Sequence, residues 1–516
     1  MLQWLLRRFK VPRDAFRFAW KRYPEHIALI SPARTLTYAE LRDRVLRLVA
    51  TLAALGLKKG DVCYVQLING GDMVEASLAS QESGIILTGL PRHADEEILS
   101  RAIQLIPARA MLYDADCEAS ATMLKRLLPD VALLRMDQIP EPSTPLAYST
   151  AKILPEDTAL IGFTSGTTGV PKVLAAAHGT YLTSLRLIVS NVHVLNARIP
   201  DVSLVGIPIA GAGSGLVLPT LLSGSALLIP EEYTVDEFLR LIEKYRVTRV
   251  FTTPSLLIDL LDHPLLDQTD LTSLRNILYG TELLPAAKLE EALRRFGPIL
   301  QQGYGSAEVL PPVSMLQPHE HWIGSHPGHP APRSVLTSVG RVVPQVQVII
   351  ADEEDHALPQ GAIGNVLIKS PTQFKGYLHQ PELNAQVLRG GWLHIGDMGY
   401  FDQDGLLHVL GRKPDLIIRH GHITYPRTVE EVLHDHPAVK ETAYVQVGDH
   451  ALMAVSLRHA WRDRMGDVSL VQELGDFLSS RVAAEDQPDG IALFIELPRS
   501  PLAKVLRREV RQTLSH

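Results

Sequence analysis

Short apolar runs and longer amphipathic stretches alternate along this chain. Continuous apolar runs occur at residues 159–163, 247–251 and 366–368, and runs of this length are typical of strands buried in a sheet. The stretches between them have the spacing of helices that bury one face. Because strands that alternate with helices form layered, mostly parallel sheets, the pattern predicts an α/β fold.

Two of the predicted helices have clear signals at their ends. Thr37 and Glu40 have the spacing of a capping box, and Gly56 follows as a helix stop. The apolar stripe between them comprises Leu41, Val45, Leu48 and Leu52. A second helix is predicted to begin at Pro285, because proline is favoured in the first helical turn, and to end before Gly297.

Two segments have the composition of irregular structure. Residues 139–146 (IPEPSTPL) are predicted to form a surface linker. Residues 317–338 combine Pro, Gly and Ser with the histidines His319, His321, His326 and His329. Clustered histidines suggest a metal site, but the HExxH spacing is missing and a proline-rich loop fixes ligand geometry poorly. A loop is therefore favoured over a metal site.

The composition is that of a soluble globular protein. A length of 516 residues allows about two to four domains. The 50 basic and 57 acidic side chains give a net charge of −7, which argues against nucleic acid as a partner, because phosphate neutralisation needs clustered Lys and Arg. Only two cysteines occur, Cys63 and Cys117, so no disulfide framework is indicated and a reducing compartment is expected.

The N-terminal sequence, MLQWLLRRFK, does not have the order of a signal peptide, because its apolar run precedes its basic residues. No uncharged apolar stretch is long enough for a transmembrane segment. Trp4, Leu5 and Leu6 beside basic residues suggest a contact with a membrane surface. Ten residues anchor poorly alone, so a first helix packed on the body is favoured. The expected location is the cytoplasm.

The most informative local pattern is FTSGTTGVPK at residues 163–172, directly after an apolar strand. Glycines let backbone N–H groups approach phosphate oxygens, hydroxyls add donors, and Lys172 supplies a compensating charge. The other residues of this loop predicted to bind ATP are Thr164, Ser165, Gly166, Thr167, Thr168 and Gly169. A Walker loop does not fit, because the glycine-to-lysine spacing differs and Val173 stands where Ser or Thr would bind magnesium. A plain Ser/Thr/Gly-rich turn is the alternative.

This loop resembles the signature of the adenylate-forming, or AMP-binding, superfamily of acyl- and aryl-CoA synthetases, stand-alone adenylation domains and firefly-luciferase-like enzymes. Further motifs follow in the family's order, from LTYAEL near residue 36 to a lysine motif near residue 504. The resemblance implies a large N-terminal domain of parallel-sheet subdomains, residues 1–411, and a small mobile α/β cap, residues 412–516. It also implies ATP and Mg²⁺ as cofactors and a small carboxylic acid that is activated as an acyl-AMP.

Residues 303–308, GYGSAE, resemble the family's GYGxTE motif. By this resemblance, Tyr304 lies against adenine, and Glu308 binds Mg²⁺ with an acceptor-only carboxylate. Ala307 replaces the family's threonine, so a hydroxyl expected near the α-phosphate is missing, and Ser306 is the candidate to replace it. The nucleotide-binding residues implied by this motif are Gly303, Tyr304, Gly305, Ser306 and Ala307.

Two further segments are matched to the nucleotide site. Residues 280–285, GTELLP, align with the part of the family that lies along adenine and the acyl pocket, although alone they read as a strand end and a turn. Their candidate ligands are Gly280, Thr281 and Glu282. Residues 391–397, GWLHIGD, resemble the family's GWxxTGD, and Asp397 is expected to accept both ribose hydroxyls. Ile395 replaces the usual threonine.

The GRKPD segment at residues 411–415 resembles the family's GRxxD hinge. Arg412 is expected to reach ribose or phosphate with its fixed fork of donors, and Asp415 is expected to be the pivot between the domains. Pro414 replaces a common lysine and fixes φ at that position. The next segment, DLIIRHGHITYP, resembles the family's thiol channel, with Gly421 as the point of close backbone approach.

The last motif, PRSPLAKVLR at residues 498–507, resembles the family's PxTxxGKxxR ending. It makes Lys504 the expected catalytic lysine, which stabilises charge as the carboxylate attacks the α-phosphate and pyrophosphate leaves. Lys172 and Glu308 are the other expected catalytic residues. Ala503 replaces the family's glycine. Outside the motif, Lys504 would be an ordinary surface lysine.

The segment IPIAGAGSG occupies the region of the family's acyl pocket. The predicted pocket residues are Ala210, Gly211, Ala212, Gly213 and Ser214. They include no acid for the amine of an α-amino acid, and an unpaired ammonium in an apolar pocket is costly. An apolar acyl or aryl acid without a second charge is therefore expected. A glycine-rich turn that enters a helix is the structural alternative.

Together the motifs predict an ATP-dependent acid–thiol ligase with coenzyme A as the preferred acceptor. An enzyme that loads the phosphopantetheine arm of an acyl or peptidyl carrier protein is the alternative within the class. The alternative from another class is a nucleotide-binding protein with reduced or lost catalysis, which the departures at Val173, Ala307, Ile395 and Ala503 keep open. An active enzyme is favoured because the charged site residues are all present, namely Lys172, Glu308, Asp397, Arg412 and Lys504.

Overall fold

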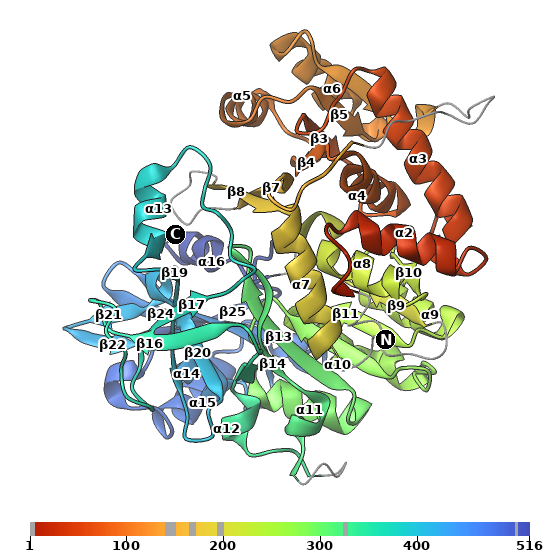
Figure 1. The fold of residues 1–516 in the computed structure, drawn as a ribbon. Helices are drawn as coiled ribbons and strands as arrows, with labels where there is room; N and C mark the ends of the chain where they lie inside the picture. The colour runs from red at the N-terminus through yellow and green to blue at the C-terminus, as the bar shows by residue number, and fades with distance from the viewer. Residues whose placement is uncertain are drawn as a thin grey trace.

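The computed structural model describes residues 6–139, 151–164, 172–192, 201–323, 329–500 and 504–515. Figure 1 shows the N-terminal elements in red and orange at one end of the molecule and the C-terminal elements in blue at the other. Sheets and helices alternate along the chain, which confirms the predicted α/β class. The predicted linker lies almost wholly outside the described residues, since only Ile139 of it is described.

A six-stranded sheet occupies the N-terminal part, in the order β6-β5-β3-β4-β7-β8. Neighbouring strands from β6 to β7 are parallel, and β8 is antiparallel to β7. All five residues of β3 are buried, as expected of a parallel strand covered on both faces. The strands are β3 (Val62–Gln66), β4 (Ile86–Gly89), β5 (Ala110–Tyr113), β6 (Ala132–Arg135), β7 (Thr158–Thr164) and β8 (Lys172–Ala177).

A nine-stranded sheet follows, in the order β15-β14-β13-β12-β11-β9-β10-β1-β2. Its central strands, from β13 to β1, are parallel, so their carboxyl ends share one edge, where ligands bind in open α/β sheets. The strands are β1 (Ile27–Ser31), β2 (Arg34–Thr37), β9 (Val202–Val205), β10 (Ala226–Leu228), β11 (Arg249–Thr252), β12 (Asn276–Gly280), β13 (Leu300–Ser306), β14 (Val309–Leu316) and β15 (Arg341–Val342).

The two helices with clear end signals form close to where the sequence places them. Thr37 caps the first, and the capping box is complete: Glu40 N donates to Thr37 Oγ1 at 3.2 Å, and Thr37 N donates to the Glu40 carboxylate at 2.7 Å. Gly56 follows it in the left-handed region, with φ +83°. The second helix begins at Ala286, one residue later than expected, because Pro285 is its N-cap.

Helices cover both large sheets, as Figure 1 shows for the helices before residue 300. These helices are α2 (Arg13–Arg22), α3 (Tyr38–Ala54), α4 (Gly71–Ser83), α5 (Glu96–Leu105), α6 (Glu118–Leu127), α7 (His178–Asn191), α8 (Ser214–Leu222), α9 (Val235–Tyr245), α10 (Pro254–Leu261) and α11 (Ala286–Phe296). The stripe on α3 is buried as predicted and includes Leu41, Val45, Leu48 and Leu52.

An antiparallel five-stranded sheet joins this part to the C-terminal elements. It contains β16 (Gln347–Ala351), β17 (Gly364–Lys369), β18 (Leu388–Arg389), β19 (Trp392–Phe401) and β20 (Leu407–Arg412), with the short helices α12 (Arg333–Leu336) and α13 (Pro381–Val387) nearby in sequence. The hairpin of β21 (Ile417–Arg419) and β22 (His422–Thr424) follows. The chain ends with β23 (Val439–Val447), β24 (His450–Leu457), β25 (Gly490–Phe494), α14 (Pro426–Leu433), α15 (Val468–Ser479) and α16 (Arg507–Leu514).

The described part of the histidine-rich segment contains a short 3₁₀ helix, Pro318–His321, and the short helix Arg333–Leu336, joined to irregular backbone. The ring of His321 is buried and hydrogen-bonded to the Gln317 carbonyl at 2.8 Å and the Tyr279 hydroxyl at 3.2 Å, and burial lowers its pKa to about 4. His326 lies outside the described residues. Within the described ranges, no group of three or more His, Cys, Asp or Glu side chains is arranged to hold a metal.

The N-terminal residues 1–5 lie outside the described part, and Leu6, the first residue described, is buried. Among the helices that the structure describes, none is both long and apolar enough to span a membrane.

Candidate active site

A cavity of about 700 Å³ opens at the carboxyl ends of β12 and β13. Its other walls come from β19 and β20 and from the C-terminal elements that carry Lys504. Among the predicted site residues that the structure describes, most line this one cavity, although they are far apart in sequence. They are Lys172, Thr281, Glu282, Gly303, Tyr304, Gly305, Ser306, Ala307, Glu308, Asp397, Arg412, Asp415 and Lys504.

Three of these side chains contact one another, the buried Asp397, the partly buried Tyr304 and the exposed Arg412. The Tyr304 hydroxyl donates to Asp397 Oδ2 at 2.5 Å, and Arg412 Nε lies 3.4 Å from Asp397 Oδ1. Asp397 and Arg412 face each other because β19 and β20 pair in that register. Burial raises the pKa of Asp397, while the hydrogen bond from Tyr304 and the charge of Arg412 act in the opposite direction. The predicted adenine and ribose ligands are therefore held together without nucleotide.

Arg412 has a second contact, with the residue that departs from the family motif. Its Nη2 donates to the backbone carbonyl of Ile395 at 2.8 Å. The Ile395 side chain is buried in the apolar core, so the backbone at this position contributes to the site while the side chain stabilises the fold. The missing threonine hydroxyl thus has no replacement from this side chain.

Glu308 lies in a second group, in the turn after β13. The Tyr377 hydroxyl donates to Glu308 Oε1 at 2.7 Å, and Lys172 Nζ lies 5.3 Å from the centre of the Tyr377 ring. Tyr377 therefore stands between the predicted metal ligand and the lysine of the phosphate loop. The Ser306 hydroxyl, the proposed substitute for the missing threonine of Ala307, is buried without a hydrogen-bond partner in the described structure.

Sequence reasoning missed Tyr377. Its segment, FKGYL, contacts both sides of the site, since Leu378 N donates to the Val173 carbonyl at 2.7 Å and Phe374 N donates to the Glu308 carbonyl at 2.8 Å. The pattern that marks it is a glycine before an aromatic residue, with Gly376 at φ +125°. A glycine that must adopt this conformation beside a buried hydroxyl is a recognisable sign of a constrained site loop.

The structure describes the two residues that flank the phosphate loop, Thr164 and Lys172. Thr164 ends β7 and pairs with Lys172 at the start of β8, so the two strands bring the ends of the loop together. Ser165, Gly166, Thr167, Thr168 and Gly169 lie outside the described residues. Val173 is fully buried within β8, which explains why an apolar residue stands where a Walker loop would have Ser or Thr.

Glu282 faces the segment that carries Lys504. Its side chain lines the cavity, and one of its carboxylate oxygens, Oε1, is buried without a hydrogen-bond partner in the described structure. Burial, reinforced by Glu441, raises the pKa of Glu282 to about 7, against the opposing charge of Lys504. Burial also lowers the pKa of Lys504. Neither side chain is an ordinary surface residue.

The two residues before Glu282 are constrained by their backbone conformation or by close packing. Thr281 has φ +76°, and its hydroxyl is buried without a partner in the described structure. A Cβ on Gly280 would lie 2.5 Å from the Gly303 carbonyl, so glycine is required for β12 and β13 to pair this closely. Gly280 shapes the wall of the cavity from behind and is not part of its lining.

The predicted acyl-pocket residues do not line this cavity. Ala210, Gly211, Ala212 and Gly213 lie in an irregular helical turn before α8, which Ser214 begins. Ile209 N donates to Asn69 Oδ1 at 2.6 Å, and the Tyr181 hydroxyl donates to the Ser214 carbonyl at 2.8 Å. A Cβ on Gly213 would lie 2.7 Å from the Ile207 carbonyl, so this glycine has a packing reason. The alternative of a glycine-rich turn entering a helix describes the segment well.

The hinge candidate Asp415 lines the cavity, whereas Gly421, the candidate for the thiol channel, lies in a nearby turn. Asp415 ends a short 3₁₀ helix, Lys413–Asp415, and its Oδ1 is 2.7 Å from Arg511 Nη2. Gly421 has φ +82° in the turn between β21 and β22, and no atom lies within 4 Å of where its Cβ would be. Backbone conformation, and not crowding, therefore explains this glycine. It does not line the cavity.

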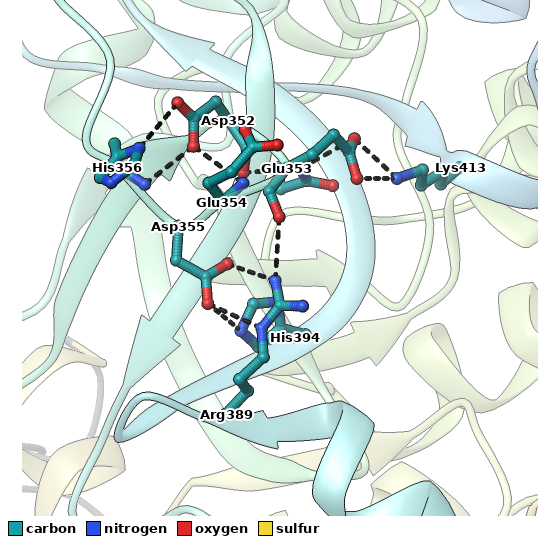
Figure 2. A network of polar contacts seen from close by, with 9 residues as sticks. Asp352, Glu353, Glu354, Asp355, His356, Arg389, His394 and Lys413 are labelled. Atoms are coloured by element: carbon teal, nitrogen blue, oxygen red, sulfur yellow. Dashed lines mark hydrogen bonds and ion pairs between the residues drawn. The ribbon is translucent and has the colours of Figure 1, made fainter.

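Figure 2 shows an acidic turn, residues 352–355, whose side chains contact basic residues on either side. Asp355 Oδ1 is 2.6 Å from Arg389 Nη2, and Asp355 Oδ2 is 3.5 Å from His394 Nε2. His394 lines the cavity. On the other side of the turn, the Glu353 carboxylate is 2.6 Å from Lys413 Nζ. The turn thus contacts both a cavity wall and the predicted hinge.

The fold and the cavity define an α/β adenylating enzyme, and comparison with known proteins agrees. The model of the AMP-binding enzyme family matches residues 16–378. The chain belongs to this family. The prediction of an AMP-forming ligase similar to acyl-CoA synthetases is confirmed.

Relatives of known activity align along nearly the whole chain. A medium/long-chain-fatty-acid–CoA ligase, FadD8 of Mycobacterium tuberculosis, is 28% identical and covers 96% of this chain and 88% of its own. A feruloyl-CoA synthase of an Amycolatopsis species is 30% identical, and the alignment covers 95% of this chain and 96% of the synthase. The amide bond synthetase McbA from Marinactinospora thermotolerans, whose structure is solved, is 30% identical in sequence. The two structures superpose with a TM-score of 0.83 over 97% of this chain and 99% of McbA.

Proposed function

We propose that the protein uses ATP to activate a carboxylic acid as an acyl-AMP and then transfers the acyl group to coenzyme A. The observation that carries the proposal is the single cavity lined by Lys172, Glu308, Asp397, Arg412 and Lys504. The two relatives described above whose names specify CoA, one acting on fatty acids and one forming feruloyl-CoA, support the choice of acceptor.

The adenylation step follows from the chemistry of these groups. Asp397 accepts the ribose hydroxyls, and Arg412 adds donors beside it. The substrate carboxylate attacks the α-phosphorus of ATP, the bond to the β-phosphate bridging oxygen breaks, and pyrophosphate leaves. Lys504 stabilises the negative charge that develops during this exchange, which is the role of a preorganised cation in a site of low dielectric.

Glu308 is the residue that fits Mg²⁺. A carboxylate supplies the hard oxygen that Mg²⁺ prefers, and this ion usually binds one or two carboxylates together with substrate phosphates. A bound Mg²⁺ would offset phosphate charge as pyrophosphate leaves. Tyr377 orients the Glu308 carboxylate through its hydrogen bond of 2.7 Å. Lys172 brings further positive charge to the same side of the cavity.

We further propose two domains, residues 1–411 and a mobile cap of residues 412–516, with Asp415 as the pivot and Gly421 near the thiol path. The clusters of buried apolar side chains support this division. Each cluster formed by described residues lies either entirely before residue 410 or entirely after residue 416, so none of them crosses the proposed boundary. The acid is proposed to carry no charge besides its carboxylate. This rests on the sequence of residues 210–214, which offers no charged partner.

Two other acceptors of the acyl group, a carrier protein and an amine, have support from similar proteins. A relative that acts on an acyl-carrier protein, the fatty acid–[acyl-carrier-protein] ligase ScoC of Streptomyces coeruleorubidus, is 27% identical over 510 residues. The likeness to an amide bond synthetase favours an amine as another candidate acceptor. All three acceptors attack the same acyl-AMP, so they share the first half-reaction.

Two assays test this function. Pyrophosphate exchange into ATP across fatty, aryl, amino and dicarboxylic acids identifies the acid, and uncharged fatty or aryl monocarboxylates are expected to support it. Mass spectrometry then follows the acyl group in parallel reactions with CoA, a phosphopantetheinylated carrier protein and simple amines. An acyl-CoA product is expected. No exchange with any acid would overturn the adenylation proposal, and an amide or carrier product would overturn the choice of CoA.

A further inference from the structure

A fully buried lysine, Lys288, lies at the contact between the N-terminal region and the C-terminal cap. It belongs to α11 and is 1% exposed. Its Nζ donates to the backbone carbonyl of Val439, the first residue of β23, at 2.7 Å. The lysine is part of the N-terminal region, whereas its acceptor belongs to the cap. Opening the contact would therefore break this bond and return the amine to water.

Lys288 is buried without a carboxylate partner. Within the described ranges, no ion pair includes it, and its ammonium group has three donors for the one carbonyl of Val439. Lys440 of β23 is also buried in this contact, but its Nζ is 2.6 Å from Asp259 Oδ1. A buried charge is costly unless it is paired. The contact therefore compensates the charge of Lys440 and disfavours a charge on Lys288.

We propose that Lys288 is a release element of this contact: hydration of its amine favours the open state and keeps docking of the cap reversible. The proposal rests on the proposed function, because it requires a cap that docks for adenylation and opens for acyl transfer. The arrangement described above is the docked one, in which Lys504 lines the cavity. Apolar side chains that replace buried ionic groups often stabilise the packed state, so Lys288 weakens a contact that an apolar residue would tighten.

The pKa of Lys288 gives this role a pH dependence. Burial lowers the pKa from the ordinary lysine value of 10.5 to about 7 in the docked state. Docking therefore releases a proton between about pH 7 and pH 10.5, and the docked state gains stability as pH rises through this range. Below about pH 7 the lysine is protonated in both states, so its contribution stays constant. The charged and titratable groups around it are Glu291 of α11, Asp262 after α10, Glu441 of β23, Arg458 after β24 and His434 after α14.

Hydrogen–deuterium exchange measures docking without any substrate, because two backbone amides are bonded across the contact. The Ala286 N–H donates to Glu431 Oε2 at 2.9 Å. The His459 N–H donates to Asp262 Oδ2 at 2.8 Å. Both amides should exchange faster whenever the contact opens.

The test variant is Lys288→Met, which keeps a long side chain and removes the amine. It should increase the protection of the Ala286 and His459 amides by roughly tenfold near pH 7, since hydration of the amine no longer favours opening. The unpaired Val439 carbonyl offsets part of this gain. After correction for the intrinsic pH dependence of exchange, wild-type protection should rise above about pH 7, and protection in the variant should not.

The two half-reactions should respond differently to Lys288→Met. A more stable docked state should leave pyrophosphate exchange at or above the wild-type rate. It should slow acyl transfer from chemically supplied acyl-AMP to CoA by roughly tenfold, because transfer requires the open state. Lys440→Met is the matched control, since it removes a lysine of the same contact that has a carboxylate partner. It should neither increase amide protection nor slow acyl transfer.

Three results would overturn the proposal: no gain of protection in Lys288→Met, an equal loss of both half-reactions, or the same gain of protection in Lys440→Met. If Lys288→Met proves unstable in thermal unfolding, the wild-type protein still decides, because protection that stays constant above about pH 7 contradicts the role of Lys288. Amide protection needs neither an acid nor an acceptor. A wrong choice of CoA, or a failure of adenylation, is thus distinguished from a wrong role for Lys288.

Discussion

The interior of each region and the contact between the two regions are built from different kinds of side chain. The interior of the N-terminal part consists of large apolar clusters around its sheets, and the C-terminal part has its own cluster around β23, β24 and α15. The contact between the parts is rich in ion pairs. Partly exposed pairs here are Arg458–Glu291, Arg499–Asp259 and Arg333–Asp435, and a further pair, Lys440–Asp259, has a buried lysine.

This difference matters for motion. Separating apolar surfaces exposes them to water at a cost of about 25 cal/mol per Å². Partly exposed ion pairs exchange their partner for water and contribute only about 0–1 kcal/mol each. A contact made of such pairs can open without disturbing either interior. We infer that this contrast allows one C-terminal unit to serve two half-reactions.

The largest effect is expected from a substitution in the active site that leaves both apolar interiors intact. Lys504→Ala should lower pyrophosphate exchange by roughly 10²- to 10³-fold, because it removes a preorganised cation from the site of developing charge. ATP binding, measured by calorimetry, should stay close to wild type, since Asp397 and Arg412 remain. Exchange at the wild-type rate would show that another group performs this role.

The next effect tests the interior directly. Leu474 of α15 is fully buried in the C-terminal cluster. Leu474→Ala should lower the free energy of unfolding by about 2–5 kcal/mol, because it removes buried methyl groups and leaves a cavity. Arg458→Ala, at the contact, should lower it by less than about 1 kcal/mol, since that pair is partly exposed. Chemical denaturation followed by tryptophan fluorescence measures both, and equal losses would contradict the contrast.

The interiors were more predictable from sequence than the contact between them. The capping box of Thr37 and Glu40 and the stripe beginning at Leu41 act within one helix, so local spacing identifies them. The strand at residues 159–163 is likewise a local pattern. Arg499 and Asp259 are 240 residues apart, and no local rule pairs them. The contact between the regions therefore emerged only from the structure.

The same reasoning explains what was found and missed in the site. Tyr304, Asp397 and Lys504 stand in motifs that the family carries, so they were identified individually, whereas the hydrogen bond between Tyr304 and Asp397 depends on how two sheets meet. Tyr377 stands in a segment to which no chemistry had been assigned. Residues 210–214 were matched to a pocket by their place in the chain, and the cavity wall is formed by other segments.

The smallest expected effect concerns the acidic turn beside the hinge (Figure 2). Lys413 directly follows Arg412, and its ammonium contacts Glu353 at 2.6 Å. Both side chains are about half exposed, at 48% and 65%, so the pair is screened by water. Glu353→Gln should therefore lower pyrophosphate exchange by no more than about fivefold, the equivalent of about 1 kcal/mol.

Salt and a neighbouring pair distinguish this effect from general damage to the turn. About 0.5 M salt should reduce the wild-type rate toward that of Glu353→Gln and leave the variant less affected, because exposed charges are screened. Arg389→Gln breaks the ion pair with Asp355 and a hydrogen bond to the Glu353 backbone carbonyl, but leaves the Glu353 carboxylate with Lys413. It should retain the salt response. A loss of more than about tenfold in Glu353→Gln would be larger than an exposed ion pair can cause. A salt response equal to that of the wild type would show that the ion pair with Lys413 is not the cause of the effect.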